Sequence, residues 1–272
     1  MQRWSPDTVF DLTVTLACWC YFTLGFLLLF APRYLLSGLF SSNKEAAFQR
    51  YNRRFYQVFF HLLQTIAPQQ QWKIDSRIAT LRGSVIVCNH RSYLDPLLLI
   101  AHLDRAITVV KSVFFTLPIF GRVIRTAGYL PSTSSGPFAH LLLSRMETMP
   151  AYLAAGGNLF VFPEGTRSRD GRIKPLHPGA LKIARQFHVP LHVLVVTNTE
   201  RLFTPGVFRF AASRKNVIQL QLVETIPVEE MQSSLADLGK RIRQAMEDGV
   251  AHSVLDVATP SPTPPFSSKS IR

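Results

Sequence analysis

A histidine and an aspartate stand five residues apart in VIVCNHRSYLDPLLLI, the stretch that covers residues 85–100. His90 and Asp95 are side-chain types that enzymes use to move protons. A pair at this spacing is also common by chance, and Asp95 before Pro96 has the form of a helix N-cap followed by proline at the first helical position. A catalytic interpretation therefore needs support from another part of the sequence.

A second loop offers that support, in NLFVFPEGTRSRD at residues 158–170. Pro163 stops an apolar strand because it cannot donate to a sheet, and Gly165 permits a tight turn. Arg167 can bind a phosphate or a carboxylate through two parallel hydrogen bonds, and Arg169 follows two residues later. Both loops follow apolar strands, which favours one shared site over two unrelated turns.

Short β-branched runs alternate with helical segments from residue 72 onward. The runs are VIVC at 85, ITVV at 107, LFVF at 159, LHVLVV at 191 and VIQLQL at 217, with helices expected at 96–102, 137–155, 178–187 and 228–248. This alternation predicts an α/β fold, a mainly parallel sheet flanked by helices, which we place at residues 68–252. Loops at the carboxyl ends of parallel strands usually hold the ligands of such sheets, and both motifs lie in such loops.

The residues before this domain are suited to a membrane. Residues 12–31 carry no charged side chain, and a helix of twenty residues matches a hydrocarbon core of roughly 30 Å. A basic amphipathic helix is expected within residues 41–66, and it can lie on a membrane surface or cover a soluble core. The neighbouring apolar helix favours the membrane, so we interpret residues 1–67 as two membrane-associating helices. The excess of Lys and Arg behind the first helix predicts that the bulk of the protein lies on the cytoplasmic side.

Two polar segments border the predicted α/β domain. The glutamine run at residues 69–71 is typical of a linker. After Ala251 the chain becomes rich in proline and serine, which predicts a disordered tail at residues 253–272.

The formal net charge is +13, from 30 Lys and Arg against 17 Asp and Glu. This excess suggests an anionic partner such as a phosphate, a nucleic acid or an acidic membrane face, although a solvated basic surface has the same composition. The interleaved basic and aromatic stripe of a nucleic-acid module is missing from the sequence, so we expect no nucleic-acid partner. Three cysteines are too few for a disulfide framework, and the sequence contains no zinc-protease, P-loop or nucleophile-elbow motif.

The two motifs together resemble the glycerolipid acyltransferases, the family of 1-acylglycerol-3-phosphate acyltransferases. NHRSYLD (89–95) and FPEGTRS (162–168) are similar to the first and third sequence blocks of that family, in the same order and at a similar separation. KSVFFTLPIFG (111–121), KPLHPGALKIA (174–184) and VPLHVLV (189–195) resemble further family segments, so the resemblance covers roughly residues 85–196. Bacterial members also carry apolar and amphipathic helices ahead of the catalytic domain.

The sequence departs from the family pattern in two places. The second block of the family typically ends in Gly-x-x-x-x-x-Arg, whereas GYLPSTSSG (128–136) offers only Ser132 and Ser134, with Arg122 and Arg125 upstream. The fourth block usually has a second proline where Val193 stands. Because the missing arginine helps to hold the acceptor phosphate in the family, a lysolipid with another headgroup stays open.

The resemblance implies transfer of a fatty acyl group from a thioester, on coenzyme A or acyl carrier protein, to a free glycerol hydroxyl. It implies that His90 takes the hydroxyl proton, a contribution of about 10²–10⁴ in rate, while Asp95 holds the other ring nitrogen. No acyl-enzyme, cofactor or metal is implied. The residues that match the acceptor-binding segments are Glu164 as organiser of its loop, Gly165, Thr166, Arg167 as the phosphate contact, and Lys111 and Arg169 as supplementary cations.

Three other functions are compatible with these motifs. The first is an acyltransferase for another lysolipid, either a lysophospholipid or a lyso-ornithine lipid. The second is a membrane protein that binds anionic lipid without turnover, which the intact His90 and Asp95 disfavour. The third is a thioester hydrolase, in which water takes the place of the lysolipid.

Overall fold

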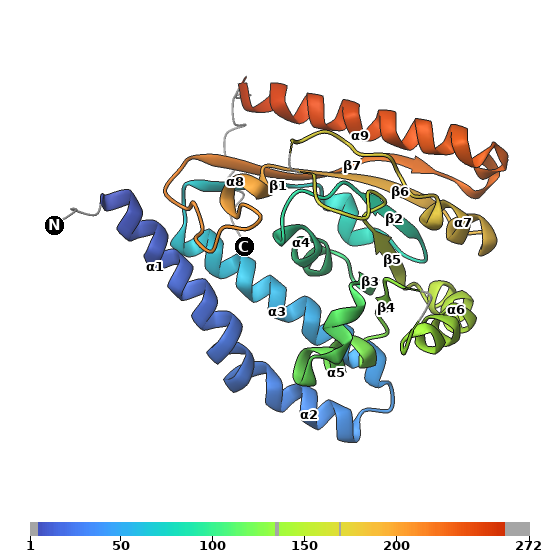
Figure 1. Ribbon diagram of the computed structural model, residues 1–272, viewed down its shortest axis with the longest axis horizontal. Coiled ribbons are helices and arrows are strands. Elements are labelled where there is room, and N and C mark those ends of the chain that lie inside the picture. Colours follow the sequence, from blue (N-terminus) through green and yellow to red (C-terminus); the bar gives the residue numbers. More distant parts are fainter. Residues whose placement is uncertain (1–4, 134–135, 169, 259–272) are drawn as a thin grey trace, which may run out of the picture.

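The computed structural model describes residues 5–133, 136–168 and 170–258, with side chains up to Ser253. Within these ranges a seven-stranded sheet crosses the molecule in the order β1-β7-β6-β2-β5-β3-β4 (Figure 1). Every neighbouring pair is parallel except β6 and β7. The predicted mainly parallel α/β fold is therefore confirmed. The strands are β1 (Gln70–Ile74), β2 (Val85–Cys88), β3 (Ala106–Val110), β4 (Leu130–Pro131), β5 (Asn158–Val161), β6 (Leu191–Thr197) and β7 (Asn216–Ile226).

Helices cover both faces of this sheet, and β2 shows why. Ile86 and Cys88 belong to a core cluster with α3 (Lys44–Ile66) and α4 (Leu94–His102). Val85 and Val87 belong to a second cluster with α7 (Gly179–Gln186) and α9 (Leu235–Ala258). Successive side chains of a strand point to opposite faces, so a strand of four apolar residues must be buried on both. The remaining helices are α5 (Pro118–Thr126), α6 (Ala139–Ala154), α8 (Thr199–Leu202) and the short 3₁₀ segments η2 (Ser76–Thr80), η3 (Ser112–Thr116) and η4 (Val228–Gln232).

One long helix precedes the sheet, made of α1 (Pro6–Cys20), the π-helical η1 (Tyr21–Phe30) and α2 (Ala31–Phe40). It extends beyond the predicted residues 12–31 at both ends. At its start Ser5 caps the helix, accepting a hydrogen bond from the backbone of Thr8, and Pro6 suits the first helical position. By length and composition it could cross a membrane. Figure 1 shows it as the blue helix along one side of α3. Its exposed apolar side chains include Leu24, Leu27, Leu28, Leu35, Leu36, Leu39 and Phe40.

The apolar face of the amphipathic helix α3 covers the core of the protein. Its apolar face is buried in the main core, with Phe59 and Leu63 fully inaccessible and Phe48 and Phe55 nearly so. That face packs against α4 and against the long N-terminal helix. The apolar face of α3 is therefore covered by the protein itself, so that face does not contact lipid, and a membrane role for the basic side of α3 stays a prediction. The exposed apolar side chains of this region lie on α1–α2 instead.

Both predicted polar segments differ from expectation. Residues 70–74 form the edge strand β1, so a linker at 69–71 is wrong. The buried Gln70 side chain donates to the carbonyls of Ala212 and Arg214, which satisfies its polar group inside the protein. At the other end α9 continues to Ala258, past the predicted start of the tail at 253, and residues 259–272 lie outside the described residues.

Candidate active site

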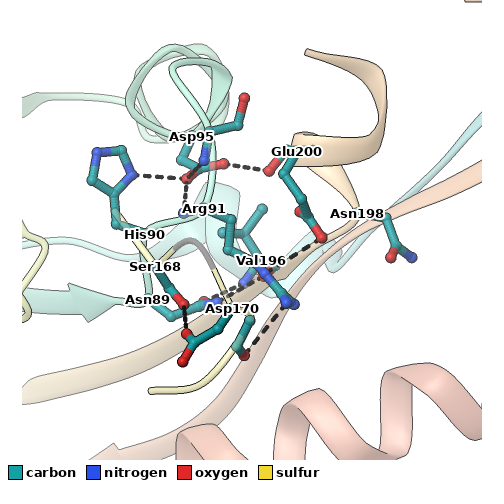
Figure 2. A network of polar contacts seen from close by, with 12 residues as sticks. Asn89, His90, Arg91, Asp95, Ser168, Asp170, Val196, Asn198 and Glu200 are labelled. Carbon is teal, nitrogen blue, oxygen red and sulfur yellow. Dashed lines mark hydrogen bonds and ion pairs between the residues drawn. The ribbon is translucent and has the colours of Figure 1, made fainter. Parts of the chain in front are cut away.

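Three loops meet at one edge of the sheet. Strand β2 lies between β5 and β6, and both pairings are parallel, so the carboxyl ends of these three strands point the same way. NHRSYLD follows β2, FPEGTRS follows β5, and α8 follows β6. The two motifs therefore do share one site, with a third contributor from α8 (Figure 2).

His90 and Asp95 form a direct contact, with Nδ1 of the imidazole 2.8 Å from Oδ2 of the carboxylate. The same oxygen accepts the backbone N–H groups of Arg91 and Ser92 at 2.6 and 2.7 Å, and Oδ1 accepts the Thr199 hydroxyl at 2.5 Å. The Asp95 side chain is inaccessible to solvent, so these bonds replace its water shell. Since α4 begins at Leu94 and this carboxylate faces the preceding loop, the N-cap interpretation of Asp95 is wrong.

The imidazole of His90 is held on its face as well as at its edge. It stacks on Phe162, with ring centroids 4.1 Å apart and planes inclined by 19°. With Asp95 ionised, Nδ1 carries the proton of the neutral ring and Nε2 presents a lone pair. Nε2 makes no hydrogen bond to any part of the chain that the structure describes. A base in this state can accept a proton from a bound hydroxyl.

The FPEGTRS loop holds the backbone of His90 on both sides. Glu164 accepts the His90 N–H at 2.9 Å and the Lys174 N–H at 3.0 Å, while the Ser168 N–H donates to the His90 carbonyl at 2.8 Å. Glu164 is 5% exposed, and this burial raises the pKa of its carboxyl. Gly165 adopts a φ of +68°, the left-handed conformation that the predicted tight turn requires.

A polar cavity of about 1050 Å³ opens beside this loop network. Lys111, Thr166 and Arg167 line it as the sequence suggested, whereas Glu164 and Gly165 are not among the residues that line it. Arg169 and Ser134 lie outside the described residues. Of the described residues the sequence analysis had not singled out, those lining the cavity are the cations Arg91 and Lys174, the carboxylates Asp170 and Glu200, and Tyr93, Ser168, Gly171, Thr204, Pro205 and Gly206.

The cations of the cavity are held in different ways. Arg91 lies 3.5 Å from Glu200 and donates to the Gly171 carbonyl at 3.4 Å. Lys174 donates to the Thr166 hydroxyl and the Arg167 carbonyl, at 3.1 and 2.9 Å. The guanidinium carbon of Arg167 lies 3.5 Å from the centre of the Tyr93 ring, a cation–π contact. Among the described residues that line the cavity, four cations stand against two carboxylates, an excess of positive charge.

The segment with the missing arginine runs beside Lys111. Strand β4 pairs with β3, the Ser132 N–H donates to the Val110 carbonyl at 2.9 Å, and the Ser132 hydroxyl accepts from the Ser112 N–H at 3.3 Å. Arg125 donates to the Phe115 carbonyl, and neither Arg125 nor Arg122 lines the cavity. Lys111 therefore lies beside the segment that departs from the family pattern, between two residues that bond to Ser132.

Thr199 is the contributor to the His90–Asp95 network that sequence reasoning missed. The sequence does indicate this position, because Thr199 follows closely after the LHVLVV run. Ligand sites usually lie at the carboxyl ends of such strands, and this applies to β6 as well as to β2 and β5. The Asn89 side chain fixes the spacing of these two strand ends, donating to the Val196 carbonyl at 2.9 Å and accepting from its N–H at 2.7 Å. Asn198 turns the chain into α8 with a φ of +66°, a conformation that Asn tolerates better than most residues.

Comparison with known proteins agrees with this geometry. A profile of the Acyltransferase family matches residues 70–197, a range that contains the NHRSYLD and FPEGTRS loops and ends with β6, just before α8. The chloroplastic 1-acyl-sn-glycerol-3-phosphate acyltransferase of Brassica napus is 29% identical over 164 residues, 58% of this chain and 47% of that protein. Residues 70–197 belong to the Acyltransferase family.

Two further similar proteins extend the comparison. A 1-acyl-sn-glycerol-3-phosphate acyltransferase of Limnanthes douglasii is 30% identical over 139 residues, 50% of this chain and 49% of that protein. The chain spans about half the length of the curated relatives it matches. The crystal structure of the 1-acyl-sn-glycerophosphate acyltransferase of Thermotoga maritima has the same fold, with a TM-score of 0.68 over 90% of this chain and 97% of that one, at 20% identity.

Proposed function

We propose that the protein transfers a fatty acyl group from an acyl thioester to the free hydroxyl of 1-acylglycerol-3-phosphate, giving phosphatidate. The observation that carries the proposal is the state of His90, whose Nδ1 is committed to the buried Asp95 while Nε2 has no partner in the described chain. The relatives of this chain named as 1-acyl-sn-glycerol-3-phosphate acyltransferases support the choice of acceptor.

The reaction follows from the position of the two nitrogens. The acceptor hydroxyl donates its hydrogen bond to Nε2 of His90, which takes the proton as the oxygen attacks the thioester carbonyl. Asp95 stabilises the imidazolium through Nδ1. When the tetrahedral intermediate collapses, the carbon–sulfur bond breaks and the leaving thiolate takes the proton from Nε2. One ester forms and one thioester breaks, so neither an acyl-enzyme nor a cofactor enters the sequence of steps.

The charge of the polar cavity suits an acceptor phosphate. A phosphate monoester carries up to two negative charges, and Lys111 and Arg167 lie on the wall of a cavity that opens beside the loops holding His90. Arg167 can offer paired N–H donors to phosphate oxygens. Hydrogen bonds that involve charged groups contribute about 1.5–3 kcal/mol each, so two such cations suffice for micromolar recognition together with the apolar tail.

A second candidate acceptor follows from the carboxylates of the cavity. Asp170 and Glu200 line the same wall as the cations, and the arginine typical of the second block is replaced by GYLPSTSSG. A headgroup with an amino group, such as that of a lyso-ornithine lipid or of lysophosphatidylethanolamine, could pair with one of these carboxylates. This candidate keeps the reaction and changes the acceptor.

Membrane attachment belongs to the same proposal. The substrates and products of such a reaction partition into bilayers, and the exposed apolar side of α1–α2 offers a surface for lipid. The net charge of +13 favours an anionic headgroup layer, and the excess of Lys and Arg behind the first helix supports placing the α/β domain on the cytoplasmic side.

An acceptor panel tests the choice of substrate. The full chain in phosphatidylglycerol vesicles is supplied with a labelled acyl thioester, on coenzyme A and on acyl carrier protein in turn, and with lysophosphatidate, lysophosphatidylethanolamine or lyso-ornithine lipid. Preferred labelling of phosphatidate supports the first acceptor. Preferred acylation of an amino-bearing lysolipid replaces it with the second, and release of free fatty acid without any acylated lipid identifies a thioester hydrolase instead.

A further inference from the structure

A small apolar pocket lies next to the polar cavity, between the N-terminal helix and the start of α4. Its volume is about 280 Å³. One wall consists of Phe203 and Phe210, whose rings stack with centroids 4.4 Å apart. The other lining residues are Cys18, Trp19 and Phe22 from the N-terminal helix and Tyr93, Leu94 and Leu97 from the start of α4.

The walls of this pocket are fixed to each other by polar contacts outside it. The hydroxyl of Thr15, on α1, accepts the Phe210 N–H at 2.9 Å, and the carboxylate of Asp11 accepts the Ser213 N–H at 2.7 Å. Asp11 and Thr15 are buried, so these bonds are shielded from water. These bonds hold the N-terminal helix against the segment that follows α8, and so they fix the position of the two walls of the apolar pocket.

Tyr93 lines both cavities. The guanidinium of Arg167, on the polar side, lies 3.5 Å from the centre of its ring, and the ring of Phe203, on the apolar side, has its centroid 6.1 Å away. Tyr93 is also part of NHRSYLD, two positions before Asp95. Tyr93 is therefore a shared wall between a cavity suited to a charged group and a pocket suited to an apolar group, in the same loop as His90.

The apolar pocket borders an exposed apolar surface. Trp19, which lines it, is 38% exposed and stacks on Phe208 with ring centroids 5.4 Å apart and planes inclined by 4°. Phe208, Val207 and Leu16 are each about half exposed or more. Trp19 and Leu16 belong to the helix whose length and composition suit a membrane, and Phe208 stacks on it from the segment after α8, so the natural neighbour of this surface is lipid.

We propose that this pocket holds the acyl chain that the lysolipid acceptor already carries, with its headgroup in the polar cavity. The inference rests on the proposed function and places one substrate within it. A thioester chain is the other possible occupant, but thioesters of coenzyme A and acyl carrier protein arrive from water. The acceptor resides in the bilayer, and only its chain would enter from the lipid side past Trp19 and Phe208.

A substitution that fills the pocket tests this placement kinetically. Leu97→Phe narrows the pocket, and Leu143→Phe makes the same change on the exposed surface of α6 as a matched control. For an acceptor with a long 1-acyl chain we expect KM to rise roughly tenfold in Leu97→Phe, the loss of one or two buried methylenes. KM for an acceptor with a four-carbon chain, and KM for the thioester, should stay unchanged. A rise in KM that depends on the length of the thioester acyl chain overturns the proposal. Equal KM values for the long-chain acceptor in Leu97→Phe and Leu143→Phe overturn it as well.

A binding measurement keeps the inference separate from turnover. Trp4→Phe and Trp72→Phe leave Trp19 as the one tryptophan of the chain, since the sequence contains three. Trace 1-acyl lysophosphatidate brominated along its chain, in unbrominated detergent micelles, should quench Trp19 saturably, and unbrominated lysolipid should relieve the quenching. Leu97→Phe should weaken it. Quenching without turnover of any lysolipid would support the pocket and refute the proposed reaction, whereas turnover of the brominated lipid without quenching of Trp19 would refute the pocket.

Discussion

The carboxylate of Glu164 accepts the backbone N–H of His90 at 2.9 Å, so a residue of one motif holds the main chain of the other. Its second oxygen accepts the Lys174 N–H, which ties the same loop to the segment that leads into α7. The site therefore depends on a buried carboxylate that does not face the cavity. Its effect should be visible in stability as well as in activity.

Glu164→Gln should change the pH dependence of unfolding. Burial raises the pKa of Glu164 above its ordinary value of 4.5, so the folded state binds its proton more tightly than the unfolded state does. The stability that this residue contributes is fully present below the unfolded pKa and is lost as the pH rises through the folded pKa. The melting temperature of the wild type minus that of Glu164→Gln should therefore fall across this window. Glu229→Gln, on the exposed η4, is the control, and a difference that is constant or rises with pH contradicts the assignment.

Thr199→Val should slow the reaction without weakening acceptor binding. The hydroxyl of Thr199 donates to Oδ1 of Asp95 at 2.5 Å, and its loss leaves one oxygen of a buried carboxylate without a partner. We expect kcat to fall about tenfold at unchanged KM, because Thr199 positions Asp95 and does not touch substrate. Thr199→Ser restores the donor and should restore kcat. Equal loss in the Val and Ser variants would show that the methyl group and its packing matter instead.

Arg167→Ala should raise KM for an acceptor with an anionic headgroup by about ten- to a hundredfold, the loss of a charged hydrogen bond. Lys111→Ala should act in the same direction with a smaller effect, because an ammonium is a point charge without the paired donors of a guanidinium. Arg243→Ala removes a cation from the exposed side of α9 and serves as the control. If all three variants show the same KM, the polar cavity does not bind the headgroup.

The exposed apolar side of α1–α2 should govern recovery with membranes. Leu28 and Phe40 are 71% and 80% exposed, so Leu28→Ser with Phe40→Ser should leave the melting temperature unchanged while lowering partition into phosphatidylglycerol vesicles about tenfold or more. Leu143→Ser, on exposed α6, should partition like the wild type. Co-sedimentation checks this, and full recovery of the double variant with vesicles would assign membrane contact to another surface.

Local patterns in the sequence located most of the sheet and the two loops of the candidate site. Strand β2 is apolar at every position and is followed by NHRSYLD, and β5 is stopped by Pro163, so each strand and its loop could be predicted from adjacent residues. Strand β1 was not predicted, because its glutamine-rich sequence becomes a strand only through pairing with β7, where Gln70 lies opposite Asn216. No pattern of adjacent residues reports a partner so distant in the chain.

The burial of the apolar face of α3 and the contact of Thr199 with Asp95 could not be predicted, for related reasons. The periodicity of α3 correctly indicated one apolar face, but periodicity does not say whether protein or lipid covers that face, and Phe59 is in fact enclosed by the protein. Thr199 is an ordinary residue in sequence, and its role depends on β6 lying beside β2. The arrangement of strands, which the sequence alone left open, decides which strand ends become neighbours.

The central claim is that His90 is the base in acyl transfer to a lysolipid. The most direct measurement is the rate of acyl transfer from a labelled thioester to lysophosphatidate by the full chain in lipid vesicles, with His90→Ala beside the wild type and His252→Ala, on the exposed part of α9, as the control. We expect transfer by the wild type and by the control. In His90→Ala the rate should be lower by at least about a hundredfold, at an unchanged melting temperature. Equal transfer by His90→Ala, or no transfer by the wild type to any lysolipid, would contradict the central claim.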